Sequence, residues 1–232
     1  MFGLFYFDWT ILIVLPAFFI SIWAQYKVSS TYKKYSTVLT KRNLTGFASA
    51  RAILDANGLH HVKIEHVRGH LTDHYDPRAN VIRLSDSVYD STSTAAVGVA
   101  AHEAGHAVQY AQNYSPIKFR MAIIPVTRFG SMLSIPLFFL GLILAFDALI
   151  LLGILLYCAV ALFQLATLPV EFNASSRALK ALSGSGMLTE DELLGAKKVL
   201  SAAAMTYVAA LLTSLLTLLR LIVLAGGRSN RR

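Results

Sequence analysis

The chain has 232 residues, of which 55% are hydrophobic and 15% are charged, and its mean hydropathy is +0.55. This composition is too apolar for the surface of an ordinary soluble protein, so it indicates an integral membrane protein with a smaller soluble part. The formal net charge of +8 does not indicate nucleic-acid binding, because the basic residues between Lys27 and Arg128 are mixed with acids, and orientation in a membrane accounts for the excess.

The first predicted element is a transmembrane helix at residues 4–24, which has aromatic residues at both ends. It lacks a basic leading region and a small-residue cleavage site, so we expect a retained anchor rather than a signal peptide. The basic residues that follow place this flank in the cytoplasm and the N-terminus outside. They are Lys27, Lys33, Lys34, Lys41 and Arg42.

Residues 25–128 are predicted to form a soluble domain. Thr45 is a helix-capping residue and Gly58 is a stop signal, so an amphipathic helix is expected between them. VKIEHV alternates apolar and polar residues in the manner of a strand. HLTDHYDPRANVIRLS predicts a β-hairpin with DPRAN as its turn and NVIRLS as its second arm.

An alanine-rich run from about Thr94 to Asn113 predicts the next helix, which Pro116 is expected to end. Beyond it, residues 129–168 are apolar and long enough to cross a bilayer twice, so we predict a helical hairpin that turns at Asp147. Its two ends return to the same face of the membrane. The lone Cys158, within this run, excludes an intramolecular disulfide and a cysteine-based zinc site.

Residues 169–205 are predicted to be a second soluble segment, and residues 206–225 a last transmembrane helix. The fold class is therefore a mainly α membrane protein with about four transmembrane helices and a small cytoplasmic α+β domain. Four spans put the tail GGRSNRR outside, against the positive-inside tendency. Either the last helix does not fully cross or this tail is an exception.

The candidate active site is the sequence HEAGH inside the alanine-rich helix. His102 and His106 are four residues apart, so on a helix both imidazoles can reach one zinc ion. Glu103 lies near the same face, where its carboxylate can take a proton from an attacking water and pass it to a leaving amine. The bare pattern can arise by chance, but its place inside a predicted helix favours a zinc site.

A catalytic zinc site needs a third protein ligand. His70 and His74 are also four apart, but in a strand they lie too far from each other to share one ion. Thr189 and Glu192 have the spacing of a capping box, which explains the acids of that region structurally. Glu171 has no such explanation, and the membrane hairpin returns it to the face that carries the histidine helix. It is either the third ligand or an ordinary interfacial charge.

Four blocks in order, SIWAQYKV, GHLTDHYDPRANVIRLS, VGVAAHEAGHAVQ and LPVEFNASSRA, resemble the YugP-like family of neutral zinc metallopeptidases. This family consists of membrane proteins found mainly in bacteria, and the match covers nearly the whole chain. More distantly, the order of motifs is similar to that of the HtpX and CAAX-prenyl-type membrane proteases. The resemblance implies a zincin-like domain that holds one zinc ion per chain through His102, His106 and Glu171, with Glu103 as the general base.

The chain departs from those distant relatives at Ser175, where they usually carry an Asp that orients a metal-bound histidine. Ser175 or Asn173 can take over this function, or the support can come from elsewhere. The same class of enzyme holds extended substrate against an edge strand, for which NVIRLS is the candidate here. His74 and Tyr75 are candidate donors to the oxyanion, although HLTDHY can equally be a purely structural arm.

Three functional hypotheses follow. The first is a membrane-anchored zinc endopeptidase that cuts membrane-associated or unfolded polypeptides at the cytoplasmic face of a bacterial plasma membrane. The second, intramembrane proteolysis, is disfavoured because AVQYAQNYSP after the motif is too polar to span. The third is a non-catalytic, zinc-stabilised membrane scaffold or assembly factor, against which the intact Glu103 argues. The sequence gives no basis for a specific substrate or an oligomeric state.

Overall fold

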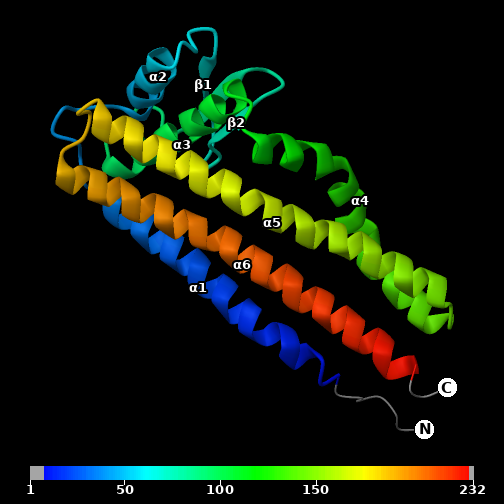
Figure 1. Ribbon diagram of the computed structural model, residues 1–232. Coiled ribbons are helices and arrows are strands. Elements are labelled where there is room, and N and C mark those ends of the chain that lie inside the picture. The colour runs from blue at the N-terminus through cyan, green and yellow to red at the C-terminus, as the bar shows by residue number, and fades with distance from the viewer. Residues whose placement is uncertain (1–7, 230–232) are drawn as a thin grey trace. The chain divides into compact units, whose positions relative to one another are not determined.

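The computed structural model describes residues 8–229, and this part of the chain is mainly helical (Figure 1). Four of its helices, α1, α4, α5 and α6, are long and apolar enough to cross a membrane, as predicted. Residues 4–7 of the first predicted span lie outside the described range. The elements are α1 (Ile11–Tyr35), α2 (Gly46–Ala56), β1 (Lys63–Val67), β2 (His74–Asp76), β3 (Val81–Ser85), α3 (Thr94–Ala111), α4 (Ser115–Ile143), α5 (Asp147–Gly184) and α6 (Glu190–Ser229).

The chain divides into two compact units, and each of them is discontinuous in sequence. Of the described residues, the helical unit contains 8–23, 119–167 and 207–229, whereas the sheet unit contains 24–118 and 168–206. The predicted division into membrane and soluble segments stays a prediction, because compactness alone does not locate a bilayer.

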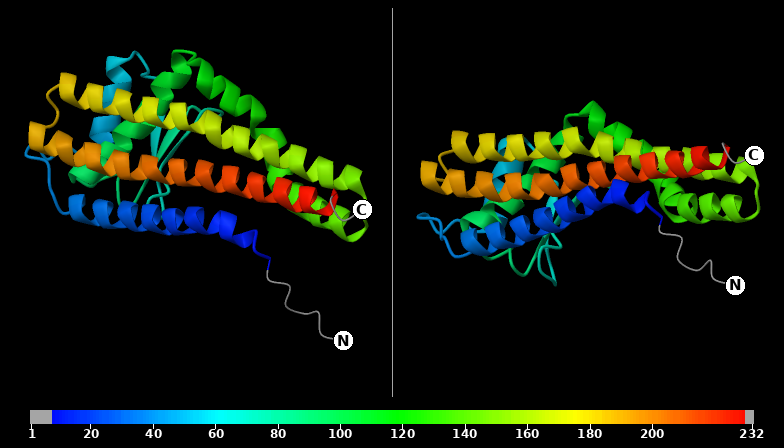
Figure 2. Two further views of the ribbon diagram at one scale, coloured as in Figure 1. Left: turned by 60° about the horizontal axis from the view of Figure 1, so that its bottom comes forward. Right: turned by 90° about the horizontal axis from the view of Figure 1, so that it is seen from below.

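In the helical unit, α4 and α5 form the predicted hairpin, which Figure 2 shows as two antiparallel arms. The turn lies between Ile143 and Asp147, as expected from the charge at this point. The arms approach so closely that a Cβ on Gly130 would lie 2.7 Å from a backbone oxygen of α5, and one on Gly153 would lie 2.7 Å from a backbone oxygen of α4. Small residues allow such contacts between helices in a membrane, where van der Waals packing drives association.

Arg220, a charged residue in the apolar part of α6, is neutralised within the helical unit. Its guanidinium donates to Asp8 Oδ2 at 2.6 Å and to Thr10 Oγ1 at 3.1 Å. Both partners stand at the start of α1, which runs beside α6 in this unit (Figures 1 and 2). The ion pair therefore removes much of the cost of placing a charge in an apolar helix.

In the sheet unit, the helix predicted after Thr45 is confirmed as α2. The Ala48 N–H donates to Thr45 Oγ1 at 3.1 Å, and Gly58 follows the helix with φ of 71°. The next predicted helix is confirmed as α3, which begins after the capping residue Ser93. The expectation that Pro116 ends this helix is wrong. The helix α3 already ends at Ala111, and Pro116 lies in the first turn of α4. Proline is tolerated there, since first-turn N–H groups have no partner inside the helix.

The sheet has three strands in the order β1–β3–β2. β2 and β3 pair antiparallel and form the predicted hairpin, and β1 pairs parallel with β3. Ile82 and Leu84 of β3 are fully buried in the core of this unit, to which α2, α3 and the ends of α5 and α6 also contribute. The sheet thus supports α3 through an apolar face.

The helix of the second hairpin arm is longer than the predicted membrane segment, because α5 continues beyond Leu168 and through Pro169 to Gly184. One missing N–H at the proline does not end the helix. The predicted capping box before α6 is confirmed in its central contact, since the Thr189 N–H donates to Glu192 Oε2 at 2.8 Å. Glu192 also accepts from the Lys41 N–H at 2.7 Å, which ties the start of α6 to the loop after α1.

Candidate metal centre

α3 carries His102, Glu103 and His106 through the middle of the sheet unit. The alanines at positions 100, 101, 104 and 107 are buried, so most of the helix surface packs into the core. His102 and His106 share the remaining face, and their ring centroids are 4.6 Å apart. The spacing of four residues therefore brings the two imidazoles together, as the sequence predicts.

The third member of this group is Glu171, which comes from α5. Glu171 Oε2 lies 3.3 Å from His102 Nε2 and 3.5 Å from His106 Nε2. The side chain is buried, with an exposed fraction of 3%. Among the described residues, these three form the only cluster of His, Cys, Asp or Glu groups with the spacing of a metal site, with ligand atoms within 4.8 Å of one another. His70 and His74, which the sequence analysis weighed as ligands, are not part of it.

The approach of α5 to α3 depends on Gly105, which lies between the two histidines. A Cβ at this position would lie 2.6 Å from the backbone oxygen of Ala174, one turn after Glu171. Real Cβ atoms do not approach a backbone so closely, so only glycine permits this contact without a shift of one helix. The small residue inside the motif is thus the reason why the carboxylate can reach the histidines.

The donor set fits a zinc ion. Two imidazole nitrogens and one carboxylate oxygen are the ligands of a common type of catalytic zinc site, which leaves a fourth position for water. In both histidines the other ring nitrogen already has a hydrogen-bond partner. His102 Nδ1 is 3.1 Å from Ser175 Oγ, and His106 Nδ1 is 3.0 Å from Gln109 Oε1. Such outer contacts orient the rings of metal-binding histidines.

The acids around His106 change its proton affinity. Burial by itself would lower the pKa of His106, but the hydrogen bond with Glu171 and the charges of Glu103 and Glu171 raise that pKa above its usual value. The imidazole thus lies in a strongly negative environment, which also favours a bound cation.

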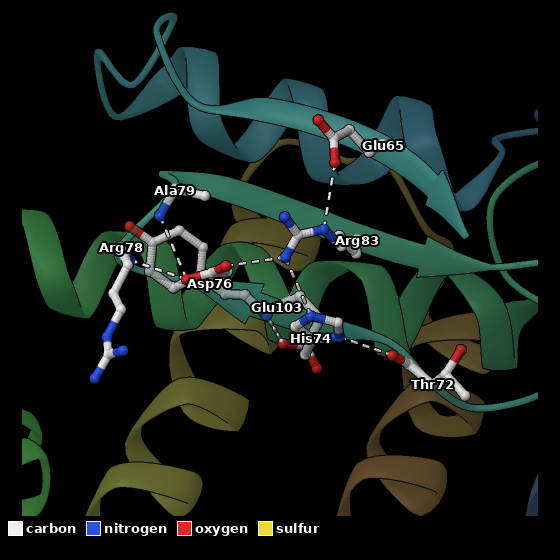
Figure 3. Close-up of polar contacts among 9 residues, drawn as sticks. Glu65, Thr72, His74, Asp76, Arg78, Ala79, Arg83 and Glu103 are labelled. Atoms are coloured by element: carbon white, nitrogen blue, oxygen red, sulfur yellow. Dashed lines mark hydrogen bonds and ion pairs between the residues drawn. The ribbon is translucent and has the colours of Figure 1, made fainter. Parts of the chain in front are cut away.

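Glu103 contacts strand β2. The Tyr75 N–H donates to Glu103 Oε2 at 2.9 Å, and Figure 3 shows the carboxylate beside this strand. The side chain has an exposed fraction of 8%. The acid of the motif is therefore held at the edge of the sheet by a backbone donor, close enough to His106 for its charge to affect that imidazole.

The expectation that NVIRLS is the edge strand is wrong. β3 lies in the centre of the sheet, and β2 is the edge strand whose backbone faces Glu103. Local pattern could not decide this, because it depends on the parallel pairing of β3 with β1. Sequence identifies the hairpin, but the partner on its other side comes from a distant segment.

His74 and Tyr75, the candidate oxyanion donors, have other contacts. His74 is opposite Arg83 in the ladder, on the outer face of the sheet, and its Nδ1 is 2.9 Å from the Thr72 oxygen. The Tyr75 hydroxyl donates to Asn80 Oδ1 at 2.9 Å, and burial raises the pKa of this hydroxyl to about 12. A role for either side chain in stabilising an oxyanion stays a prediction.

Arg83 fixes the edge strand from the outer face of the sheet (Figure 3). Its guanidinium donates to Asp76 Oδ2 on β2 at 3.0 Å and to Glu65 Oε2 on β1 at 3.3 Å. The hydrogen bond from Arg83 is also the main reason why the pKa of Asp76 lies below its ordinary value. One side chain thus links all three strands and steadies the strand that holds Glu103.

Sequence reasoning assigned no function to Gln109, although this residue contacts a histidine of the cluster. It lies three positions after His106 on the same helix, which is a spacing that brings side chains into contact. The contact between Gln109 and His106 could therefore have been predicted from the sequence. The partners of Gln109 on α5 could not, because they are more than sixty positions away.

Four membrane-length helices together with a His–His–Glu cluster are consistent with a membrane-bound zinc peptidase. Residues 10–226 match the family described as "Putative neutral zinc metallopeptidase", and the chain belongs to this family. It is 49% identical over 221 residues to "Putative membrane protease YugP" of Bacillus subtilis (strain 168), an alignment that covers 95% of this chain and 98% of that protein. The family resemblance seen in the sequence is thus confirmed. No solved structure matches the chain.

Proposed function

We propose that this protein is a membrane-anchored zinc endopeptidase that hydrolyses peptide bonds in membrane-associated or unfolded polypeptides. The observation that carries the proposal is the position of Glu171 Oε2, 3.3 and 3.5 Å from the Nε2 atoms of His102 and His106. Membership of a zinc metallopeptidase family supports the choice of metal and of reaction.

His102, His106 and Glu171 would hold one zinc ion per chain. When bound, the zinc supplies Lewis-acid chemistry, because it makes a water molecule more acidic and polarises the carbonyl of the scissile bond. The contacts of Ser175 and Gln109 with the two imidazoles keep the rings oriented towards the ion.

Glu103 is the proposed general base. Its carboxylate accepts a proton as water attacks the peptide carbonyl, and then returns that proton to the nitrogen of the departing amine. The bond from the Tyr75 N–H orients one carboxylate oxygen, so that the group is held in place before the reaction.

β2 is the proposed position for extended substrate, since it is an edge strand and, of the two edge strands, the one whose backbone contacts Glu103. A peptide added to this edge would gain main-chain hydrogen bonds regardless of sequence, which suits unfolded or membrane-associated chains. The basic flank around Lys33 and Lys34 supports a location of the sheet unit on the cytoplasmic face of a bacterial plasma membrane.

The proposal is tested with two variants of the full chain, purified in detergent. We expect Glu103→Gln to keep the zinc content of the wild type and to lower hydrolysis of fluorescein-labelled casein by at least about 100-fold, as loss of an acid–base group does. We expect Glu171→Ala to lose zinc as measured by elemental analysis. Full hydrolysis by Glu103→Gln would contradict the assigned base, and zinc retention by Glu171→Ala would contradict the metal site. Unchanged cellular function in a Glu103→Gln variant that has lost hydrolysis would favour the scaffold function.

A further inference from the structure

We propose that Gln109 is a positioning residue that sets both the tautomer of His106 and the registry between α3 and α5 at the metal centre. This inference rests on the proposed function, because it takes His106 as a zinc ligand. Gln109 itself does not touch the metal position in this arrangement, and it acts through His106 and through the backbone next to Glu171.

Gln109 is fully buried and its side-chain amide makes three hydrogen bonds. Oε1 lies 3.0 Å from His106 Nδ1, whereas Nε2 donates to the Val170 oxygen at 2.8 Å and to Asn173 Oδ1 at 3.0 Å. Both hydrogens of the amide nitrogen are therefore used on α5. A buried polar group in an apolar core is costly unless its bonds are made in this way.

These contacts leave only one orientation of the amide. If the amide were turned over, its oxygen would face the carbonyl of Val170, which is an acceptor and has no hydrogen to give. The amide nitrogen would at the same time lose this bond. Val170 thus decides that the oxygen of Gln109 faces His106.

The orientation of the amide determines the state of His106. An amide oxygen can only accept, so the hydrogen in the contact belongs to His106 Nδ1. His106 Nε2 is then the nitrogen that faces Glu171, and in the neutral ring it is the nitrogen that can bind a metal. Gln109 therefore determines which nitrogen of the ring is offered to the ion.

The same amide also aligns the two helices. Val170 precedes Glu171 and Asn173 follows it, so the bonds from Gln109 reach α5 on both sides of the carboxylate. One bond goes to the backbone oxygen of Val170 and the other to the side-chain oxygen of Asn173. Asn173 Oδ1 accepts a further bond from Arg177 Nε at 2.7 Å, and Arg177 donates to Gln112 of the segment after α3 at 2.5 Å. The bond between Arg177 and Gln112 is thus a second link from α5 to the segment after α3. It does not involve the amide of Gln109 and does not contact a histidine.

Gln109→Met tests the proposal, since methionine has a similar volume and cannot accept from His106. Gln112→Met is the matched control, because it removes the bond with Arg177 and leaves Gln109 in place. We expect zinc affinity, measured by competition with a chromogenic chelator, to fall about 10- to 100-fold in Gln109→Met, as is typical for loss of an outer contact to a metal ligand. The control is expected to bind zinc as the wild type does.

His106→Ala separates the failure of this proposal from the failure of the proposed function. If Gln109→Met binds zinc as tightly as the wild type while His106→Ala loses it, the metal centre stands and Gln109 has no positioning role. If His106→Ala also keeps its zinc, the metal centre itself is wrong and this inference falls with it. Equal losses in Gln109→Met and Gln112→Met would show general damage between α3 and α5, and would also overturn the proposal.

A spectroscopic measurement on the zinc-loaded wild type tests the proposal without depending on the folding of any variant. We expect the Nδ1 hydrogen of His106 to give a slowly exchanging, low-field imidazole signal in a sample with ¹⁵N-labelled histidine, because this hydrogen is buried in a bond to Gln109. The signal is expected to disappear by exchange with water in Gln109→Met and to persist in Gln112→Met. A rapidly exchanging His106 Nδ1 hydrogen in the wild type would overturn the proposal.

Discussion

The two histidines of the cluster have different outer partners, and this difference matters at the scale of single residues. The oxygen of Gln109 is a fixed acceptor for His106, whereas Ser175 presents a hydroxyl to His102 that can donate or accept. Ser175 therefore holds the ring of His102 without deciding which of its nitrogens carries the hydrogen. His102 is thus the less strictly positioned of the two.

Replacement of Ser175 by an acceptor-only group tests this difference. We expect Ser175→Asp to raise zinc affinity by up to about 10-fold, because a carboxylate would fix His102 with its hydrogen on Nδ1 and would add negative charge near the ion. Ser175→Ala is expected to lower the affinity by less than Gln109→Met does. Both are measured by competition with a chelator, and a weaker zinc affinity in Ser175→Asp than in Ser175→Ala would contradict this account.

Much of the cluster could be predicted residue by residue. The pair His102 and His106 with Glu103 between them follows from helical spacing alone, because residues four apart share a face of the helix. The sequence could not decide whether Glu171 is a metal ligand or an ordinary interfacial charge, since its partners lie on another helix. Its observed place beside both imidazoles agrees with the ligand interpretation, and the zinc measurement on Glu171→Ala decides it.

At the scale of elements, the close contact between α3 and α5 determines whether the cluster exists. The contact is possible because Gly105 of α3 lies against the backbone of Ala174 on α5, at a place where a Cβ would come within 2.6 Å. Backbone cannot yield as a flexible side chain does, so any larger residue must move one helix away from the other.

We therefore expect Gly105→Ala to weaken zinc binding and to lower the free energy of unfolding by about 1–3 kcal/mol through overpacking. Gly184→Ala, near the end of α5, is the control, because its Cβ would meet nothing within 4 Å. Thermal unfolding in detergent and chelator competition measure the two effects. Unchanged zinc binding in Gly105→Ala would show that the contact is not what brings Glu171 to the histidines.

At the scale of the whole molecule, the open question is the orientation of the chain in the membrane. The basic flank after the first apolar segment predicts that the sheet unit is cytoplasmic and that the tip of the α4–α5 hairpin is outside. The single Cys158 makes this testable, since its replacement by Ala gives a chain without cysteine. Single cysteines can then be placed at exposed positions such as His61 and Asp147.

We expect a membrane-impermeant maleimide to label Asp147→Cys in intact bacterial cells and to label His61→Cys only after lysis. The physical reason is the predicted topology, in which both arms of the hairpin cross the bilayer and the hairpin tip faces the side opposite to residues 25–128. Labelling after lysis controls for accessibility at both positions. Labelling of His61→Cys in intact cells would place the candidate metal centre outside and contradict the predicted location.

Local pattern in the sequence determined the four membrane-length helices, the capped helices α2 and α3, the β2–β3 hairpin and the histidine pair. Apolar periodicity, caps and turn residues act within a few positions, so they can be seen without any knowledge of the fold. Only the tertiary structure decided that β3 is central, that α5 continues past Pro169, and that Glu171 and Gln109 meet at His106. These features depend on which distant surfaces pack together, and the close contact at Gly105 that selects this packing becomes visible only when both helices are in place.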